Sequence, residues 1–212
     1  CAFSFMALLV AREGMFVTGG HQIMANLVAL CYMMPMAVGI ASASLTAQAI
    51  GAEDMPRARK TALAGQLIVL VGALATIGIL IVGKKDILAV YTDDLQVAAV
   101  AATLMQVIPY FHLCDAMQCI NSYLLRAYKV ATVPLLLQIF ALTGVGLLGG
   151  WWLGFGPSAG ALQPIVDWIM PGAPIGAATL WLMALIGLGV SAVLLYFWYW
   201  RVLRQSRRRT AP

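Results

Sequence analysis

Residues 108–129 read IPYFHLCDAMQCINSYLLRAYK, and this stretch places a single acidic residue, Asp115, inside a largely apolar run. The run extends back to Leu95 and holds no Lys, Arg or Glu before Arg126. A helix needs about 20 mainly apolar residues, at ~1.5 Å of rise each, to cross ~30 Å of hydrocarbon. The sequence therefore predicts a membrane-spanning helix that carries one carboxylate.

Four further stretches have the length and apolarity of membrane spans. The predicted spans cover about residues 21–48, 61–82, 95–125, 131–153 and 174–200, and residues 1–10 form a partial helix. Charged residues make up 10% of the 212-residue chain, against about 25% in typical soluble domains. The sequence thus predicts an all-α integral membrane protein. Residues 1–200 form a polytopic helix bundle with five full crossings, and residues 201–212 form a basic tail.

Lysine and arginine are distributed unevenly between the two sets of connections. The set that includes the C-terminal tail contains ten of the 13, namely Arg57, Arg59, Lys60, Arg126, Lys129, Arg201, Arg204, Arg207, Arg208 and Arg209. The other set contains Arg12, Lys84 and Lys85. Since cytoplasmic loops retain an excess of these residues, we expect a multi-pass protein of the cell inner membrane with a cytoplasmic C-terminus.

The formal net charge of +5 does not indicate a nucleic-acid partner, because most basic residues lie in short clusters next to apolar runs and form no continuous face. His112 and Cys114 would point to nearly opposite sides of a helix, so they cannot share a metal ion. No hydrolase, zinc-protease or nucleotide-binding motif occurs in the chain. We therefore expect a protein that is not an enzyme and that has no metal site or organic cofactor.

Asp115 is predicted to lie near the middle of the bilayer, about 16 Å from the helix end at Arg126. An unpaired charge at this depth costs roughly 2.5–3.5 kcal/mol, so such residues usually face the bundle interior and mark ion pathways. Phe111, Gln118 and Ser122 share the helix face of Asp115, because they are one or two turns away from it. We interpret Asp115 as a cation-binding residue.

Five side chains are expected to line a path for substrate beside this acid. They are Asn26, Met33, Phe111, Gln118 and Ser122. Pro35 and Pro109 lie inside predicted spans, where each removes a backbone hydrogen bond. We expect these two prolines to act as hinges, although simple helix shape remains an alternative.

Small residues recur at every fourth position in two predicted spans, at Gly39, Ala43, Ala47 and Gly51, and at Gly146, Gly150 and Gly154. Such stripes let the backbones of neighbouring helices approach closely in a membrane. We expect both to be packing faces.

Three stretches resemble the C-terminal half of multidrug and toxic compound extrusion (MATE) transporters of the bacterial NorM type. They are HQIMANLVALCYMMPMAVGIASASLTAQAIGA at 21–52, IPYFHLCDAMQCINSYLLRAYK at 108–129, and GWWLGFGP with PIGAATLWLMALIGLG around the last predicted external loop. The resemblance implies helices seven to twelve of a twelve-helix antiporter, with the first helix incomplete and the N-terminal transmembrane half missing from this chain. It also implies a cation site at Asp115. The family often has Tyr one turn earlier, where this chain has Phe111.

The resemblance further implies a cation-coupled multidrug efflux antiporter that exports organic, often cationic, compounds in exchange for Na⁺ or H⁺. A lipid-linked saccharide flippase of similar architecture is the alternative transporter, although its cavity should be more basic. A non-transporting membrane scaffold subunit is a further alternative, and it would tolerate the loss of the Asp115 charge.

Overall fold

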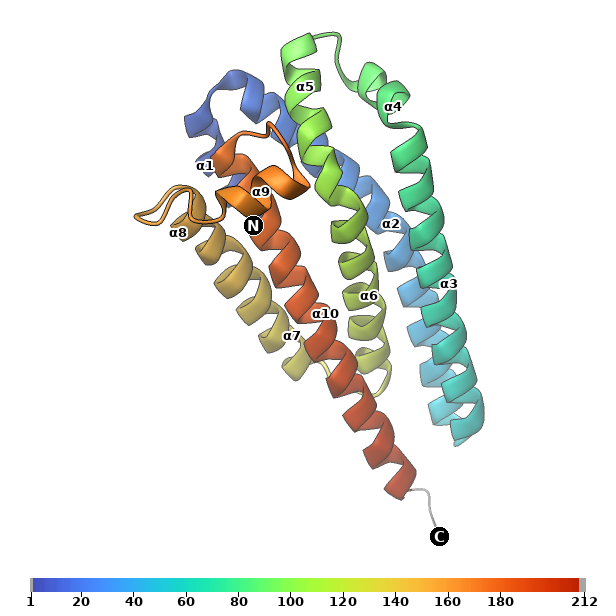
Figure 1. The fold of residues 1–212 in the computed structure, drawn as a ribbon. Helices are drawn as coiled ribbons and strands as arrows, with labels where there is room; N and C mark the ends of the chain where they lie inside the picture. Colours follow the sequence, from blue (N-terminus) through green and yellow to red (C-terminus); the bar gives the residue numbers. More distant parts are fainter. Residues whose placement is uncertain (1, 210–212) are drawn as a thin grey trace.

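The computed structural model describes residues 2–209, which form helices packed side by side (Figure 1). No strand occurs within these residues. In chain order the helices are α1 (Ala2–Val10), η1 (Ala11–Glu13), α2 (Met15–Gly51), α3 (Met55–Val82), α4 (Lys84–Tyr91), α5 (Leu95–Leu104), η2 (Met105–Val107), α6 (Ile108–Ala127), α7 (Thr132–Gln138), η3 (Ile139–Leu148), α8 (Gly149–Gly154), α9 (Gln163–Ile169) and α10 (Ile175–Arg209).

Five helical segments are long and apolar enough to cross a membrane, as the sequence predicts. They are Met15–Gly51, Met55–Val82, Leu95–Ala127, Thr132–Gly154 and Ile175–Ser206. The last helix does not end at Trp200, because α10 continues without a break to Arg209. Most of the segment expected as a basic tail is therefore helical, whereas Cys1 and residues 210–212 lie outside the described part of the chain.

The centre of the bundle is α6, which lies between α3 and α10 (Figure 1). It also packs along α2, and no other two helices make more extensive contact within the described residues. Its buried side chains include Asp115, Gln118, Asn121 and Ser122. The helix predicted from the opening stretch is thus surrounded by other helices, which shields its polar residues from lipid.

The packing stripe on α2 is one position away from the one expected. Gly39 faces the bundle as predicted, since an added Cβ would lie 2.7 Å from the Tyr123 ring. Ala47 and Gly51 are exposed, however, and Ser42 and Thr46 are the buried residues instead. Ser42 packs directly against Gly65 of α3, so a small residue at this position lets the two helices approach closely. The expected stripe from Gly39 to Gly51 is therefore wrong at Ala47 and Gly51, whereas Ala43 is half-buried.

The stripe from Gly146 to Gly154 packs against α10. An added Cβ would lie 2.8 Å from Leu180 at Gly150 and 3.2 Å from the Gly176 carbonyl oxygen at Gly154. Part of this segment, η3, is wound as a π-helix. The wider turns of η3 also approach α10, because a Cβ on Gly187 would lie 2.6 Å from the Ala141 carbonyl oxygen.

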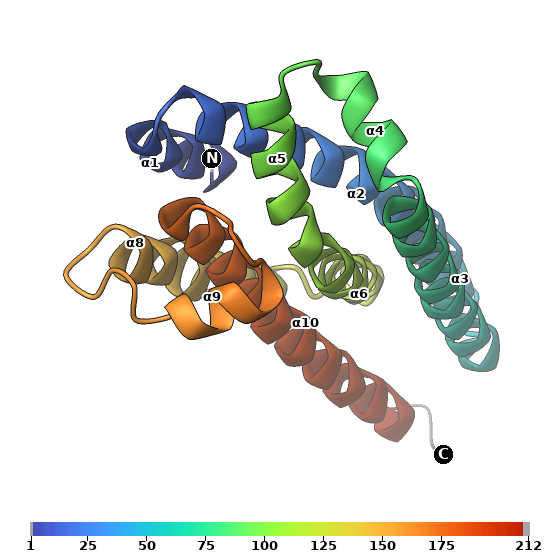
Figure 2. The same cartoon turned by 45° about the horizontal axis from the view of Figure 1, so that its top comes forward.

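Two short helices lie in the connections at the end of the bundle where α5 begins, opposite the end that holds the C-terminus (Figures 1 and 2). One is α9, between the last two spans, and the other is α4, between the second and third spans. Glu13 joins the first and last helices at this end, since its carboxylate accepts from the backbone N–H groups of Gly176 (2.9 Å) and Ala177 (2.8 Å). The carboxylate thereby caps the positive N-terminus of α10.

The two prolines occupy different backbone settings. Pro35 is buried inside α2, which is assigned as one continuous helix across it. Pro109 lies in the first turn of α6, where a missing N–H costs little, directly after the 3₁₀ turn η2. The span formed by α5, η2 and α6 therefore changes from α-helix to 3₁₀-helix and back to α-helix just before Pro109.

Candidate functional site

An apolar cavity of about 450 Å³ lies between α2, α6, η3 and α10. Asp115 and Gln118 of α6 line it together with Phe111, and α2 contributes Tyr32 and Met33. The rest of its wall is mainly aliphatic and comes from α2, η3 and α10, with Met6 from α1. No Lys or Arg is among the lining residues that the structure describes. We refer to this space as the apolar cavity.

Asp115 is 7% exposed, and among the described residues it accepts one long hydrogen bond from Gln118, whose Nε2 lies 3.3 Å from Oδ1. No basic residue pairs with Asp115 within residues 2–209. The position sits in the middle of α6, where the ring of Phe111 is one turn away on the same face. The carboxylate therefore borders a space in which it has few competing partners.

Gln118 connects the acid to two other helices. Its Oε1 accepts from Nε2 of Gln138 at 2.8 Å and from Oγ of Ser191 at 3.3 Å. These residues belong to α7 and α10, so the polar chain ties three helices together beside the cavity. A movement of α7 or α10 relative to α6 would change the hydrogen bonding of Gln118, and through it the surroundings of Asp115.

A packed aromatic layer supports one side of the cavity. The Phe111 ring meets Trp181 edge to face, with centroids 5.4 Å apart, and Trp181 packs against His21 at 5.6 Å. Trp181 and His21 are fully buried. This layer fixes the orientation of Phe111, which lies one helical turn before the acid.

The structure brings together three of the five expected substrate-path residues with Asp115. Met33, Phe111 and Gln118 line the apolar cavity. Asn26 lies elsewhere, since it is exposed and its Oδ1 accepts a 2.7 Å hydrogen bond from the Tyr91 hydroxyl. Ser122 is buried and does not line the cavity.

Sequence reasoning missed three polar residues of this region. Tyr32 brings a hydroxyl group to the cavity wall. The resemblance implies a Tyr one turn before the acid, but this chain has Phe111 there, which carries no hydroxyl group. Gln138 and Ser191 complete the polar chain through Gln118. Each is an isolated polar residue in an apolar span, and this rarity was the one signal that could have indicated a functional role. No spacing in the sequence relates these residues to Asp115.

No three His, Cys, Asp or Glu side chains lie close enough to hold a metal ion in the part of the chain that the structure describes. Asp115 is thus the one carboxylate among the residues lining the cavity. It can interact with a proton, a single small cation or a positively charged organic group.

Comparisons with known proteins address the family. A model of the MatE family matches residues 1–152. The chain belongs to the MatE family. A "Probable multidrug resistance protein NorM" of Xanthomonas axonopodis is 34% identical over 209 residues, which cover 99% of this chain and 42% of the relative. A similarly named protein of Aromatoleum aromaticum is 39% identical over 73% of this chain and 33% of its own length.

Two further MatE-related proteins extend the comparison. "Multidrug resistance protein PmpM" of Pseudomonas aeruginosa is 32% identical over 97% of this chain and 40% of its own length. A solved MATE transporter, described as an outward-facing conformation, superposes with a TM-score of 0.80 at 13% identity, over 98% of this chain and 43% of the other. The chain therefore has the MATE fold and spans about two fifths of the length of these proteins.

The family confirms several expectations from the sequence. The resemblance to NorM-type transporters and the all-α, multi-pass membrane fold are both confirmed. Members of the MatE family are transporters, so the expectation that the chain is not an enzyme is also confirmed.

Proposed function

We propose that the chain forms one lobe of a multidrug efflux antiporter, which exports organic, often cationic, compounds in exchange for Na⁺ or H⁺. The observation that carries this proposal is a single buried carboxylate, Asp115, in the wall of an otherwise apolar cavity. Family membership and the names of the relatives support the same function.

The chemistry of the cavity suits an amphipathic cation. Its volume of about 450 Å³ lies in the usual range of small-molecule sites, ~300–1,000 Å³. Met33 and Met36 give it flexible, polarizable walls that adapt to ligands of different shape. Asp115 supplies the only negative charge among the lining residues, so it favours a positively charged group.

Exchange follows if the coupling ion and the drug compete for the same charge. A proton or Na⁺ on Asp115 neutralises the carboxylate and removes the attraction for an organic cation. Loss of that ion restores the attraction, and the long hydrogen bond from Gln118 leaves the carboxylate free to change partner. Gln118 also accepts hydrogen bonds from Gln138 of α7 and Ser191 of α10, so a change in the charge of Asp115 can alter how these two helices pack against α6. In this proposal η2 with Pro109, and Pro35 in α2, are the hinges.

The alternatives from the sequence have less support. A flippase for a lipid-linked saccharide handles an anionic headgroup, whereas no Lys or Arg is among the described residues lining this cavity. A scaffold role gives no reason for an acid beside an apolar cavity, since an unpaired buried charge is costly.

A second lobe is part of the proposal. The relatives are more than twice as long as the region they share with this chain. Transporters built from two related halves bind substrate between or beside the halves and alternate access by rocking one against the other. We therefore propose that the described bundle works together with an N-terminal transmembrane half, and that the 212-residue chain expressed alone exports nothing.

The decisive experiment measures ethidium efflux by the complete two-lobe transporter in everted vesicles under an imposed Na⁺ or pH gradient. Asp115→Asn keeps the shape of the side chain but removes its charge, so gradient-driven efflux should fall to the level of empty vesicles. Asp93→Asn removes an exposed carboxylate from a connection and should leave efflux unchanged. Normal coupling in Asp115→Asn, at equal amounts of protein, would exclude the assigned role.

The orientation is proposed from the charge asymmetry. Arg57, Arg126 and Arg201 lie at the same end of the bundle, and cytoplasmic ends retain basic residues. A fluorescent reporter that matures only in the cytoplasm should be bright when fused after Lys60 or Arg209 and dark when inserted at Ser158. A bright fusion at Ser158 would reverse the orientation.

A further inference from the structure

A second concave region lies at the basic end of α10 and shares no lining residue with the apolar cavity. It consists of two adjoining hollows, of about 650 and 470 Å³, which have Tyr196, Trp200 and Arg204 in common. Arg201 and Gln205 border the first hollow, and α3 borders the second. We call this region the arginine–aromatic groove.

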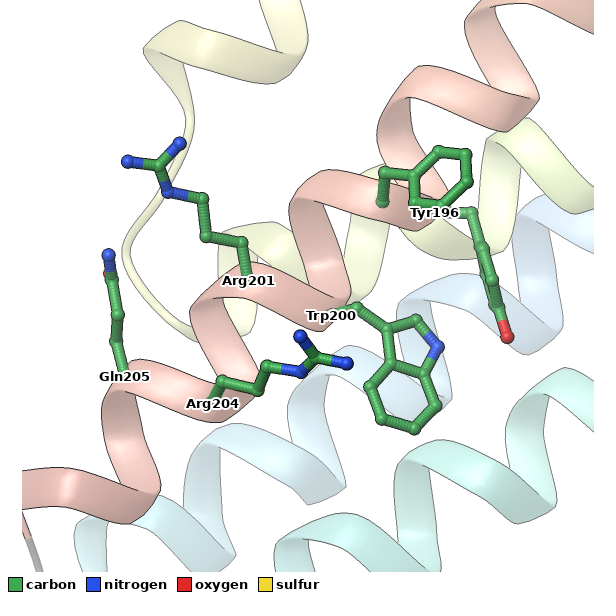
Figure 3. Close-up of a pocket in the computed structure, with 6 residues that line it drawn as sticks. Tyr196, Trp200, Arg201, Arg204 and Gln205 are labelled. Carbon is green, nitrogen blue, oxygen red and sulfur yellow. The ribbon is translucent and has the colours of Figure 1, made fainter.

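The walls of the groove carry positive charge beside aromatic rings. In Figure 3 the Arg204 side chain reaches toward Trp200, and its guanidinium carbon lies 5.8 Å from the ring centroid. Arg201 stacks over the neighbouring Trp198 ring at 5.1 Å. No Asp or Glu lines either hollow in the described part of the chain. The groove therefore presents cations without a protein anion to neutralise them.

Arg59 brings a further charge from α3 into the second hollow, opposite Arg204 of α10. Its Nε atom is buried and has no hydrogen-bond partner within residues 2–209. Burial raises the pKa of Tyr128 at the same end, and the charge of Arg59 opposes this shift, which places the guanidinium near that hydroxyl. Two guanidinium groups that line one hollow repel each other, and an anion between them offsets this repulsion.

The groove lies at the depth of lipid headgroups. From Ile175, about 20 residues of helix cross the hydrocarbon, so Tyr196 to Arg204 fall at or beyond its edge. Tyr and Trp are typical of this level, and Trp200 is 44% exposed. Guanidinium groups match the geometry of phosphate oxygens with paired hydrogen bonds, while the rings offer apolar contact to glycerol and the start of the acyl chains.

We propose that the arginine–aromatic groove binds the phosphate group of an anionic phospholipid, with Arg59 and Arg204 on opposite sides of the phosphate. The lipid occupies the space between α3 and α10 and neutralises charges that the protein leaves unpaired. This site is independent of the proposed transport function, because its residues do not line the cavity of Asp115.

Native mass spectrometry of the full chain tests the proposal, with the protein released from nanodiscs of equal parts phosphatidylglycerol and phosphatidylcholine. Phosphatidylglycerol should be retained preferentially. Each arginine near a membrane surface contributes about fivefold to the binding of an anionic lipid, so Arg59→Gln/Arg204→Gln should lower retention by about 25-fold. Arg57→Gln/Lys129→Gln removes two exposed charges at the same end, outside the groove, and should retain the preference.

The single variant Arg204→Gln controls for misfolding, because Arg204 is exposed and its replacement should not disturb the fold. Its retention of phosphatidylglycerol should fall about fivefold. Addition of glycerol 3-phosphate distinguishes a lipid from a free phosphate compound and should not displace phosphatidylglycerol. Equal retention of the two lipids, equal losses in the two double variants, or displacement by glycerol 3-phosphate would each overturn the assignment. The first of these outcomes would favour an acidic protein segment as the occupant.

Discussion

The apolar cavity and the arginine–aromatic groove differ in size, in charge and in depth. The cavity places one carboxylate among aliphatic and methionine side chains in the middle of the bundle. The groove places three arginines against tyrosine and tryptophan near the end of α10. The cavity wall is formed by closely packed helices, with α10 nearly touching η3 at Gly187. The groove lies at the end of α10, between this helix and α3, and is bordered by exposed side chains such as Arg204. The contrast indicates that charge and depth together determine which ligand a hollow in a membrane protein accepts.

The largest expected effect comes from adding a cation to the cavity. Met33 lines it and is 58% exposed, so Met33→Arg can be accommodated without displacing a buried side chain. A guanidinium about 8 Å from a bound organic cation, at an effective dielectric constant near 20, should weaken binding about 30-fold. Equilibrium binding of tetraphenylphosphonium to the purified chain measures this, and Met33→Leu is the matched control. Unchanged affinity in Met33→Arg would place the cation site outside the cavity.

A smaller effect is expected from disturbing the packing of the cavity wall. Gly187→Ala puts a Cβ 2.6 Å from a backbone oxygen of η3, and overpacking of this kind costs about 1–3 kcal/mol. We expect a lower melting temperature and weaker tetraphenylphosphonium binding, with unchanged retention of phosphatidylglycerol. Gly189→Ala on the same helix meets only Cys114, at 3.9 Å, and should behave as the unmodified chain. Equal melting temperatures for the two variants would contradict the close approach of α10 to η3.

Removing one ring from the groove should have a weaker effect. Trp200→Leu deletes the ring beside Arg204, and a partly exposed cation–π contact contributes about 0.5–1 kcal/mol. Retention of phosphatidylglycerol in native mass spectrometry should fall about threefold, while tetraphenylphosphonium binding stays constant. Trp168→Leu, at an exposed tryptophan in α9, is the control. A parallel loss of cation binding in Trp200→Leu would mean that the two hollows are not independent.

The smallest effect is expected at Glu13, which lines neither hollow. Glu13→Gln keeps one acceptor for the N-terminus of α10 but loses the charge, which is worth about 0.3–1 kcal/mol at a helix end. The melting temperature should fall slightly, and both binding measurements should remain unchanged. Asp93→Asn, at an exposed acid in the connection between α4 and α5, should show no decrease. Altered ligand binding in Glu13→Gln would show that this end of the bundle communicates with the hollows.

The sequence predicted what depends on long apolar runs and isolated charges. The five spans follow from length and hydropathy, and Asp115 stood out because it is the only acid in its span. The sequence did not reveal Gln138 and Ser191 as partners of Gln118, because such contacts depend on how distant helices are rotated toward one another. The shift of the α2 packing stripe to Ser42 and Thr46 has the same cause. Asn26 was expected near substrate, but its exposed side chain accepts a hydrogen bond from Tyr91 at the end of α4.

The hydrogen bonds of Glu13 have a consequence for the order of assembly. Their partners are 163 and 164 residues later in the chain, so they form only after nearly the whole sequence has been synthesised. Until Ile175 and the residues after it reach the membrane, the connection between the first two helices lacks its anchor, and the N-terminus of the last helix lacks its cap. Contacts this distant in sequence form late, because the ends of a long loop must first meet. Fastening of this end is therefore expected to be a late event in biogenesis, after the earlier spans have inserted.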